Sequence, residues 1–193
     1  MIRRDVLKSL AALAAVPAAA WADEPGLRLA AKEAPFGPDT VTNRARLRAA
    51  EPYVPRPQIP AGWRDLTYDQ YRQIWFDGRN ALWEGTDVAQ RVDVFPPGLY
   101  FPQAVALHVV ENGMARPLVF DMGVFDTTDN FPDLPLDDTL GYSGMRLRAE
   151  LEKQGIFQEY AVFQGASYFR GIGTGETYGL SARGLALKTG DPA

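Results

Sequence analysis

The chain has 193 residues, a formal net charge of −4, one histidine and no cysteine. The lack of cysteine excludes disulfides, thiol catalysis and Cys/His zinc sites, and the acidic balance argues against binding to nucleic acid or to anionic membrane surfaces. The length suffices for one domain with a buried core.

Residues 1–22 have the pattern of a removable export signal. A charged start leads into an apolar run, Leu10–Ala20, that is too short to span a bilayer. The paired Arg3 and Arg4, followed by the segment 6–8 (Val-Leu-Lys), resemble the twin-arginine export motif. The motif predicts the twin-arginine export machinery as a partner, and an ordinary secretory signal is the alternative.

The cleavage site of this signal is predicted between Ala22 and Asp23. Ala20 and Ala22 supply the small residues that a signal peptidase requires before the cut. Cleavage removes three basic residues and one acidic residue, so the mature chain would carry a net charge of −6 and no stable membrane anchor. Either export route predicts a periplasmic protein.

Residues 23–62 form a proline-rich lead-in. One short helix is expected near residues 39–50, with Thr40 or Thr42 as its N-cap. Residues 53–62 are expected to have an extended backbone conformation similar to that of polyproline.

The helical pattern returns at Thr67, within the segment 63–193 that we predict to be the folded unit. Thr67 as N-cap and Gln70 three residues later form a capping box, and Leu66 and Tyr71 are placed as a hydrophobic staple. A short helix is therefore predicted here.

From Ala81 onward the hydrophobic pattern has a period of two. Asn112-Gly113 is typical of a type I′ hairpin. Residues 145–151 alternate cleanly, which places Arg146 and Arg148 on a water-covered face. The strand candidates are 91–95, 104–110, 114–120, 145–151, 160–164 and 180–187. Repeated short strands predict a mainly β fold, an antiparallel β-sandwich with a few short helices.

Few residues here suit metal or cofactor chemistry. His108 lies in a strand-like run, so a structural histidine is favoured over a catalytic one. The acidic segment 121–138 lacks the spacing of a calcium loop, and a solvated loop is favoured over a cation or sugar site. Gly171, Gly173 and Gly175 do not form a dinucleotide fingerprint. We expect neither a metal nor a cofactor.

Two sequence blocks, residues 161–173 and 178–186, identify a family. They resemble the periplasmic glucan biosynthesis proteins, the G and D types of the osmoregulated periplasmic glucan family. Further blocks agree in order at 66–74, 81–83, 95–101 and 141–147. The resemblance runs from about residue 50 to the last residues, and the twin-arginine motif favours the D type.

The resemblance implies work on β-1,2-linked glucan in the periplasm. Members of the family are similar to glycoside hydrolases, which need a general acid and a base. They are also much longer than this chain, which therefore looks like an amino-terminal piece, with a short paralogue as the alternative. The resemblance implies that the family's catalytic carboxylates fall downstream of the portion present here, so no catalytic residue is assigned and the piece is expected to be inactive alone. A non-catalytic glucan-binding or scaffold protein is the alternative function.

A sugar-binding face could remain in this chain. Its candidates are two tyrosine rings and two arginine donors: Tyr168, Arg170, Tyr178 and Arg183. Tyr168 and Arg170 share one face of a strand, and Phe169 lies on the other. The alternative makes Phe169 and Tyr178 core residues and Arg183 the partner of a buried carboxylate. Three tryptophans are expected in the core: Trp63, Trp75 and Trp83.

Overall fold

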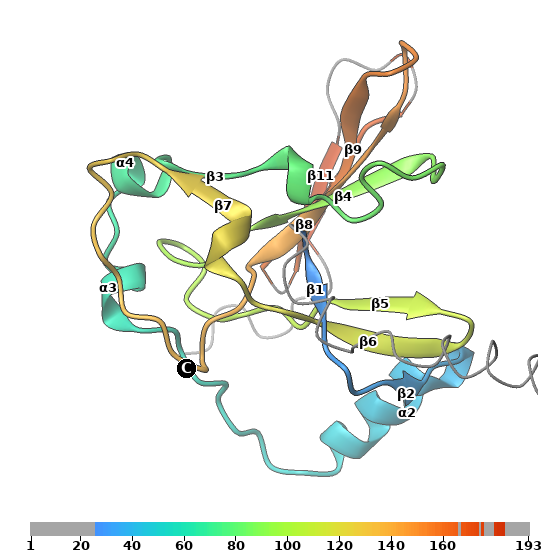
Figure 1. The fold of residues 1–193 in the computed structure, drawn as a ribbon. Helices are drawn as coiled ribbons and strands as arrows, with labels where there is room; N and C mark the ends of the chain where they lie inside the picture. The colour runs from blue at the N-terminus through green and yellow to red at the C-terminus, as the bar shows by residue number, and fades with distance from the viewer. Residues whose placement is uncertain (1–25, 166, 174, 176–179, 184–193) are drawn as a thin grey trace, which may run out of the picture.

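The computed structural model describes residues 26–165, 167–173, 175 and 180–183 (Figure 1). The expected cleavage site at Ala22–Asp23 and the candidate Tyr178 lie outside these residues. Within the described part of the chain, no helix is both long and apolar enough to cross a membrane.

The described elements are three short α-helices, two 3₁₀ turns and three sheets. The helices are α2 (Pro38–Ala49), α3 (Ala61–Arg64) and α4 (Tyr68–Tyr71), and the 3₁₀ turns are η1 (Gly78–Asn80) and η2 (Met122–Val124). The largest sheet has the order β11-β10-β9-β8-β4, with strands β4 (Gln90–Phe95), β8 (Gly144–Glu150), β9 (Phe157–Gln164), β10 (Tyr168–Gly171) and β11 (Leu180–Arg183).

The second sheet is built around β6, and the third is a pair of short strands. The second contains β1 (Arg28–Leu29), β2 (Ala34–Pro35), β5 (His108–Glu111) and β6 (Met114–Val119), and the third contains β3 (Ile74–Phe76) and β7 (Phe125–Thr127). Every described strand pairing is antiparallel. The expected fold class, mainly antiparallel β and sandwich-like with a few short helices, is confirmed.

The proline-rich lead-in is attached to the second sheet. Arg28 pairs with Val119 and Ala34 pairs with Ala115, so β1 and β2 follow successive parts of β6. Figure 1 shows α2 immediately after these strands, beside β2 and below β5 and β6. The lead-in thus brings a helix next to the sheet.

The expected helix near residues 39–50 is present as α2, but its predicted cap is wrong. Gly37 is the N-cap and Pro38 occupies the first helical position, where its fixed φ suits the helix. Thr40 lies one turn inside, and its Oγ1 accepts the backbone N–H of Gly37 at 2.9 Å. Pro38 starts the helix two residues before Thr40 could cap it.

The capping box at α4 is confirmed. The backbone N–H of Gln70 donates to Thr67 Oγ1 at 3.2 Å, and the backbone N–H of Thr67 donates to Gln70 Oε1 at 2.9 Å. Leu66 is buried in the core, and Tyr71 packs against the same cluster.

The hairpin between β5 and β6 is also confirmed, whereas the start of β5 differs from the prediction. Asn112 and Gly113 have φ values of 51° and 75°, as a type I′ turn requires. The strand begins at His108 instead of residue 104, because the backbone N–H of Val105 donates to Tyr142 O at 2.9 Å. Val105 therefore contacts a different part of the chain, although Leu107 O still accepts the backbone N–H of Leu118 in β6.

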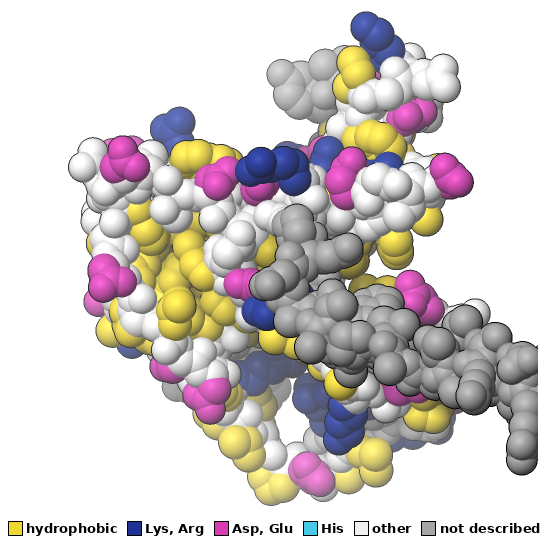
Figure 2. Space-filling view, in the orientation of Figure 1, with side chains coloured by type: hydrophobic (Ala, Val, Ile, Leu, Met, Phe, Trp, Pro, Cys, Tyr) yellow, Lys and Arg dark blue, Asp and Glu magenta, His cyan; other side chains and the backbone are white. Residues whose placement is uncertain are grey.

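The hydrophobic core is enclosed by α3, α4, β3 and β4. Its buried members are Ile59, Trp63, Leu66, Ile74, Val94, Val124, Phe125, Leu140 and Tyr142. The expectation that the acidic segment 121–138 is a solvated loop is wrong, because the segment contains η2 and β7 and its residues Val124 and Phe125 are buried. The segment is anchored to this core, since Trp63 Nε1 donates to Pro135 O at 2.8 Å and Phe131 packs near the same ring. Figure 2 shows hydrophobic side chains gathered in this region of the surface.

Only one of the three tryptophans expected in the core is fully buried. Trp63 is 1% exposed, Trp83 is half-buried, and Trp75 is 46% exposed. The prediction for Trp75 is wrong because side chains alternate along β3, so that Ile74 points into the core and Trp75 points outward.

Gly144 marks a close approach between β8 and β9. A Cβ at this position would lie 2.1 Å from the backbone oxygen of Phe163, whereas a Cβ at Gly171 in the same sheet would meet nothing nearer than 3.9 Å. Only glycine fits at Gly144 without moving a strand.

We expect Gly144→Ala to lower the free energy of unfolding by at least about 2 kcal/mol, because the clash is with backbone and cannot be relieved by a rotamer change. Gly171→Ala is the control and should change it by no more than about 0.5 kcal/mol. Urea unfolding followed by circular dichroism measures both. Equal stability of the two variants would contradict the close approach.

Tyr142 connects the core to the second sheet. Its hydroxyl donates to Val119 O at 3.1 Å and accepts the backbone N–H of Asp121 at 3.2 Å. Burial raises the pKa of Tyr142 from its ordinary value of 10.0 to about 12. Burial likewise raises the pKa of Tyr71 to about 12, although hydrogen bonds oppose the shift.

These two tyrosines should remain neutral in the folded chain until about pH 12. Because the folded pKa is raised, the stability that they contribute is present below pH 10.0 and is lost as the pH rises towards about 12. A titration of phenolate absorbance should show late-ionising tyrosines whose signal is reduced in Tyr142→Phe. An unchanged titration in that variant would refute the assignment.

Candidate functional site

The register of the five-stranded sheet gathers polar residues on one side. Asp93 lies opposite Arg146, Arg146 lies opposite Val162, and Val162 lies opposite Arg170. Residues directly opposite each other share a face of the sheet. We call this side the polar face, and its members are Asp93, Arg146, Arg148, Glu159, Tyr168 and Arg170.

Asp93 is the buried centre of the polar face. Its side chain is 1% exposed and accepts three N–H groups, from Arg146 Nε at 2.6 Å and from Arg148 Nη2 and Nε at 2.8 and 3.1 Å. A buried carboxylate is tolerated only when it is paired in this way. The expected water-covered face therefore needs a correction, since Arg148 is only 19% exposed and both arginines are bound to Asp93.

Glu159 extends this network towards β10. It pairs with Arg170, and its Oε2 lies 3.9 Å from Arg146 Nη1. Arg146 thus lies between two carboxylates, and the ion pairs form a continuous series from Arg148 through Asp93 and Glu159 to Arg170.

A β-bulge places Glu159 in this series. The register shifts between Leu147 and Arg148, so that Arg148 lies opposite Glu159, whereas regular pairing would place it opposite Tyr160. In a regular strand Glu159 and Val162 would face opposite sides, because they are three residues apart. The bulge turns the carboxylate onto the polar face.

Tyr168 and Arg170 lie together on the polar face, as predicted. Both side chains are half-buried, and the hydroxyl of Tyr168 is 3.0 Å from Ser181 Oγ on β11. The backbone of Arg183 pairs with Tyr168. Tyr178, the fourth predicted residue, lies outside the described residues.

Phe169 lies on the opposite side of β10. It is 41% exposed and stacks on Phe163 of β9, with ring centroids 6.4 Å apart and planes 27° apart. The alternative that made Phe169 a core residue is wrong in the described structure, because these two rings cover each other at the surface.

The polar face is suited to binding more than to proton transfer. Both oxygens of Asp93 accept N–H groups from arginines, and Glu159 is paired with Arg170 and Arg146. Tyr168 offers a partly exposed ring, and Arg170 offers donors held in place by Glu159. Among the residues that the structure describes, no group of three or more His, Cys, Asp or Glu side chains could hold a metal ion.

Sequence reasoning missed the two carboxylates of the polar face. Asp93 had a signal, because it lies in an alternating strand and the pair Arg146 and Arg148 needs an acidic partner. Glu159 had none, because the bulge that turns it is not visible in the hydrophobic pattern. His108, the one histidine, is exposed at the start of β5 and lies away from this face.

Comparison with known proteins points to one family. The family model described as periplasmic glucan biosynthesis protein, MdoG, matches residues 36–193. Glucans biosynthesis protein G 1 of Shewanella oneidensis is 41% identical over 162 residues, which cover 83% of this chain and 30% of that protein. The glucans biosynthesis proteins G of Shewanella sp. strain ANA-3 and of Shewanella putrefaciens are 40% and 41% identical over the same shares.

The chain therefore spans about 30% of the length of these relatives. All three carry the name G. The preference for the D type, which depends on the twin-arginine motif, stays a prediction.

Removing the charge of Asp93 tests the network. Asp93→Asn should lower the free energy of unfolding by about 3 kcal/mol, because it leaves Arg146 and Arg148 without their shared counter-ion. The control is Glu111→Gln, which breaks an exposed pair with Arg116 and should cost less than about 1 kcal/mol. Chemical denaturation measures both, and a similar loss in the two variants would rule out a structural role for the buried pair.

Proposed function

The chain belongs to the periplasmic glucan biosynthesis protein family, and from this premise we propose that it acts in the periplasm in osmoregulated glucan synthesis. In this proposal it binds β-1,2-linked glucan along the polar face, and the twin-arginine machinery exports it. The export route is supported by Arg3, Arg4 and Lys8.

The observation that carries the glucan-binding proposal is the shared face of Tyr168 and Arg170. Two residues apart on a strand, they are about 7 Å from each other along the chain, which is the scale of one sugar unit. The tyrosine ring can pack on the apolar C–H face of a glucose unit. The guanidinium can donate hydrogen bonds to its hydroxyl groups.

Pre-organisation supports the same proposal. Arg170 is paired with Glu159, which is in turn close to Arg146. A side chain already held in one orientation loses less entropy when it binds a ligand. The network anchored at Asp93 would thus position a donor before the glucan arrives.

Cleavage of the glucan is proposed to lie elsewhere in the family's proteins. Inverting hydrolysis needs a carboxylic acid and a carboxylate about 6.5–9.5 Å apart, with room for a water molecule between them. Asp93 is buried, and both it and Glu159 are bound to arginines. We therefore propose binding without cleavage for this chain, and action on the glucan backbone for the longer family members.

Titration of the purified chain with linear β-1,2-glucan, followed by calorimetry, tests this proposal. Tyr168→Ala and Arg170→Leu should each weaken binding by about tenfold, because each removes one contact to the sugar. The control is Phe169→Leu, which changes a neighbouring exposed ring on the other side of β10 and should leave the affinity unchanged.

Binding that is absent, or that weakens equally in Phe169→Leu, would refute the polar face as the glucan site. The same samples are assayed for new reducing ends. No new reducing ends are expected. If this chain shortens the glucan, the proposal of binding without cleavage is wrong and the chain is a catalyst.

A further inference from the structure

A cleft lies between α2 and the second sheet, on a different part of the molecule from the polar face. Its volume is about 790 Å³, within the range of ligand-binding pockets. Its floor is largely apolar, with Phe36, Val105 and Val110 among the lining residues. Its charged lining residues are four cations and one anion: Lys32, Arg44, Arg48, Arg56 and Glu33.

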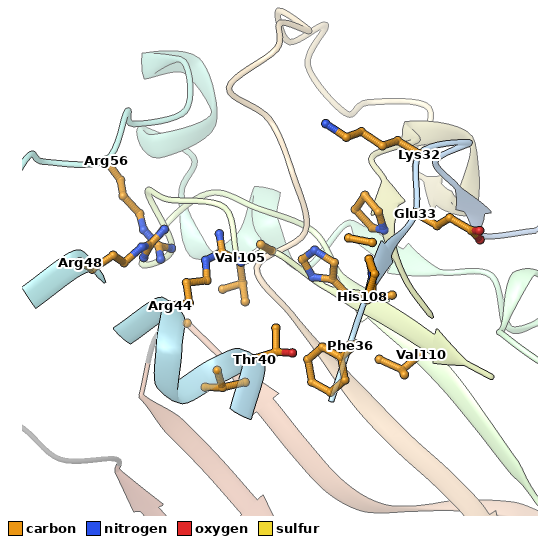
Figure 3. Close-up of a pocket in the computed structure, with 17 residues that line it drawn as sticks. Lys32, Glu33, Phe36, Thr40, Arg44, Arg48, Arg56, Val105, His108 and Val110 are labelled. Carbon is orange, nitrogen blue, oxygen red and sulfur yellow. The ribbon is translucent and has the colours of Figure 1, made fainter. Parts of the chain in front are cut away.

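The three arginines of the cleft are gathered at one of its ends. Figure 3 shows the side chains of Arg44, Arg48 and Arg56 converging at one end, while Glu33 lies at the other end together with Lys32. Figure 2 shows Lys and Arg side chains gathered beside a hollow near α2. Three guanidinium groups therefore face the same space, and no carboxylate of the described lining residues lies among them.

These three arginines differ from the others whose side chains the structure describes. Ion pairs engage seven arginines: Arg28, Arg79, Arg91, Arg116, Arg146, Arg148 and Arg170. Three more contact a neighbouring side chain: Arg46 with Asn43, Arg64 with Gln58 and Arg72 with the ring of Tyr68. Within the described residues, no ion pair involves Arg44, Arg48 or Arg56.

This arrangement is unfavourable for the helix itself. Arg44 and Arg48 are four residues apart, so they lie on one face of α2 and repel each other. Arg48 gains from the helix dipole because it lies in the last turn, but Arg44 and Arg56 do not. In addition, α2 has no buried residue to compensate. A bound anion would remove the repulsion.

We propose that this cleft is a binding site for a small polyanion, a ligand with two or more phosphate or carboxylate groups. The guanidinium groups of Arg44, Arg48 and Arg56 bind these oxyanions through paired N–H donors, the geometry for which arginine is suited. The apolar floor accommodates the carbon part of the ligand. This site does not depend on glucan binding at the polar face.

Inorganic pyrophosphate and citrate are the probes, each titrated into the purified chain by calorimetry at low salt. We expect saturable binding at one site, with the tighter probe identifying phosphate or carboxylate as the favoured group. Arg44→Gln/Arg48→Gln should weaken it by about tenfold or more, because two charge-assisted contacts are lost. Arg56→Gln should weaken binding of the probe as well. Because Arg56 lies outside the helix, this variant replaces the double variant as the test if the double variant fails to fold.

The matched control is Arg46→Gln/Arg72→Gln, which removes the same charge from exposed arginines outside the cleft. It should bind both probes as the unmodified chain does. If neither probe binds saturably, or if the control weakens binding as much as the cleft variants do, the site is overturned. Because neither probe contains sugar, this outcome is independent of the test for glucan binding.

Discussion

A buried carboxylate, Asp93, is the constraint on which the five-stranded sheet depends. With 1% of its side chain exposed, it is stable as an ion only while arginines on the neighbouring strand neutralise it. That requirement fixes the register of β4 against β8, because Arg146 must lie opposite Asp93. Through Arg146 and Glu159 the same requirement extends to Arg170. The orientation of a half-buried donor on β10 is thus set by a charge buried on β4, three strands away in the sheet.

The polar face also shows how far alternation along a strand can predict a site. It places Arg146 and Arg148 on one side of β8, and Tyr168 and Arg170 on one side of β10, and the structure agrees. It would place Glu159 on the wrong side, because the prediction assumes regular pairing. A single extra residue in β9 reverses this. Bulges depend on how two strands meet, and the pattern of one strand does not contain that information.

The predictions of local structure are confirmed where residues close together in the sequence determine the conformation. The capping box at Thr67 and the turn at Asn112 need only residues within one turn, and both are confirmed. The strand expected from residue 104 fails because Val105 bonds to Tyr142, a contact across 37 positions of the chain. The prediction that Trp75 is buried is wrong for a related reason. Its hydrophobicity predicts burial, but only one side of β3 packs against the core.

The net charge also fails to predict a local site, because it describes the whole molecule and not one cleft. A value of −4 argues against polyanionic partners that cover a large surface. A small ligand experiences mainly the charges within a Debye length, about 8 Å at physiological ionic strength. Over that distance the arginine end of the cleft presents Arg44, Arg48 and Arg56 without the opposing Glu33. The acidic residues that set the overall sign lie largely elsewhere, for instance in the segment 121–138. An acidic chain can therefore contain an anion site, and only the fold, which brings residue 56 back beside α2, reveals where it is.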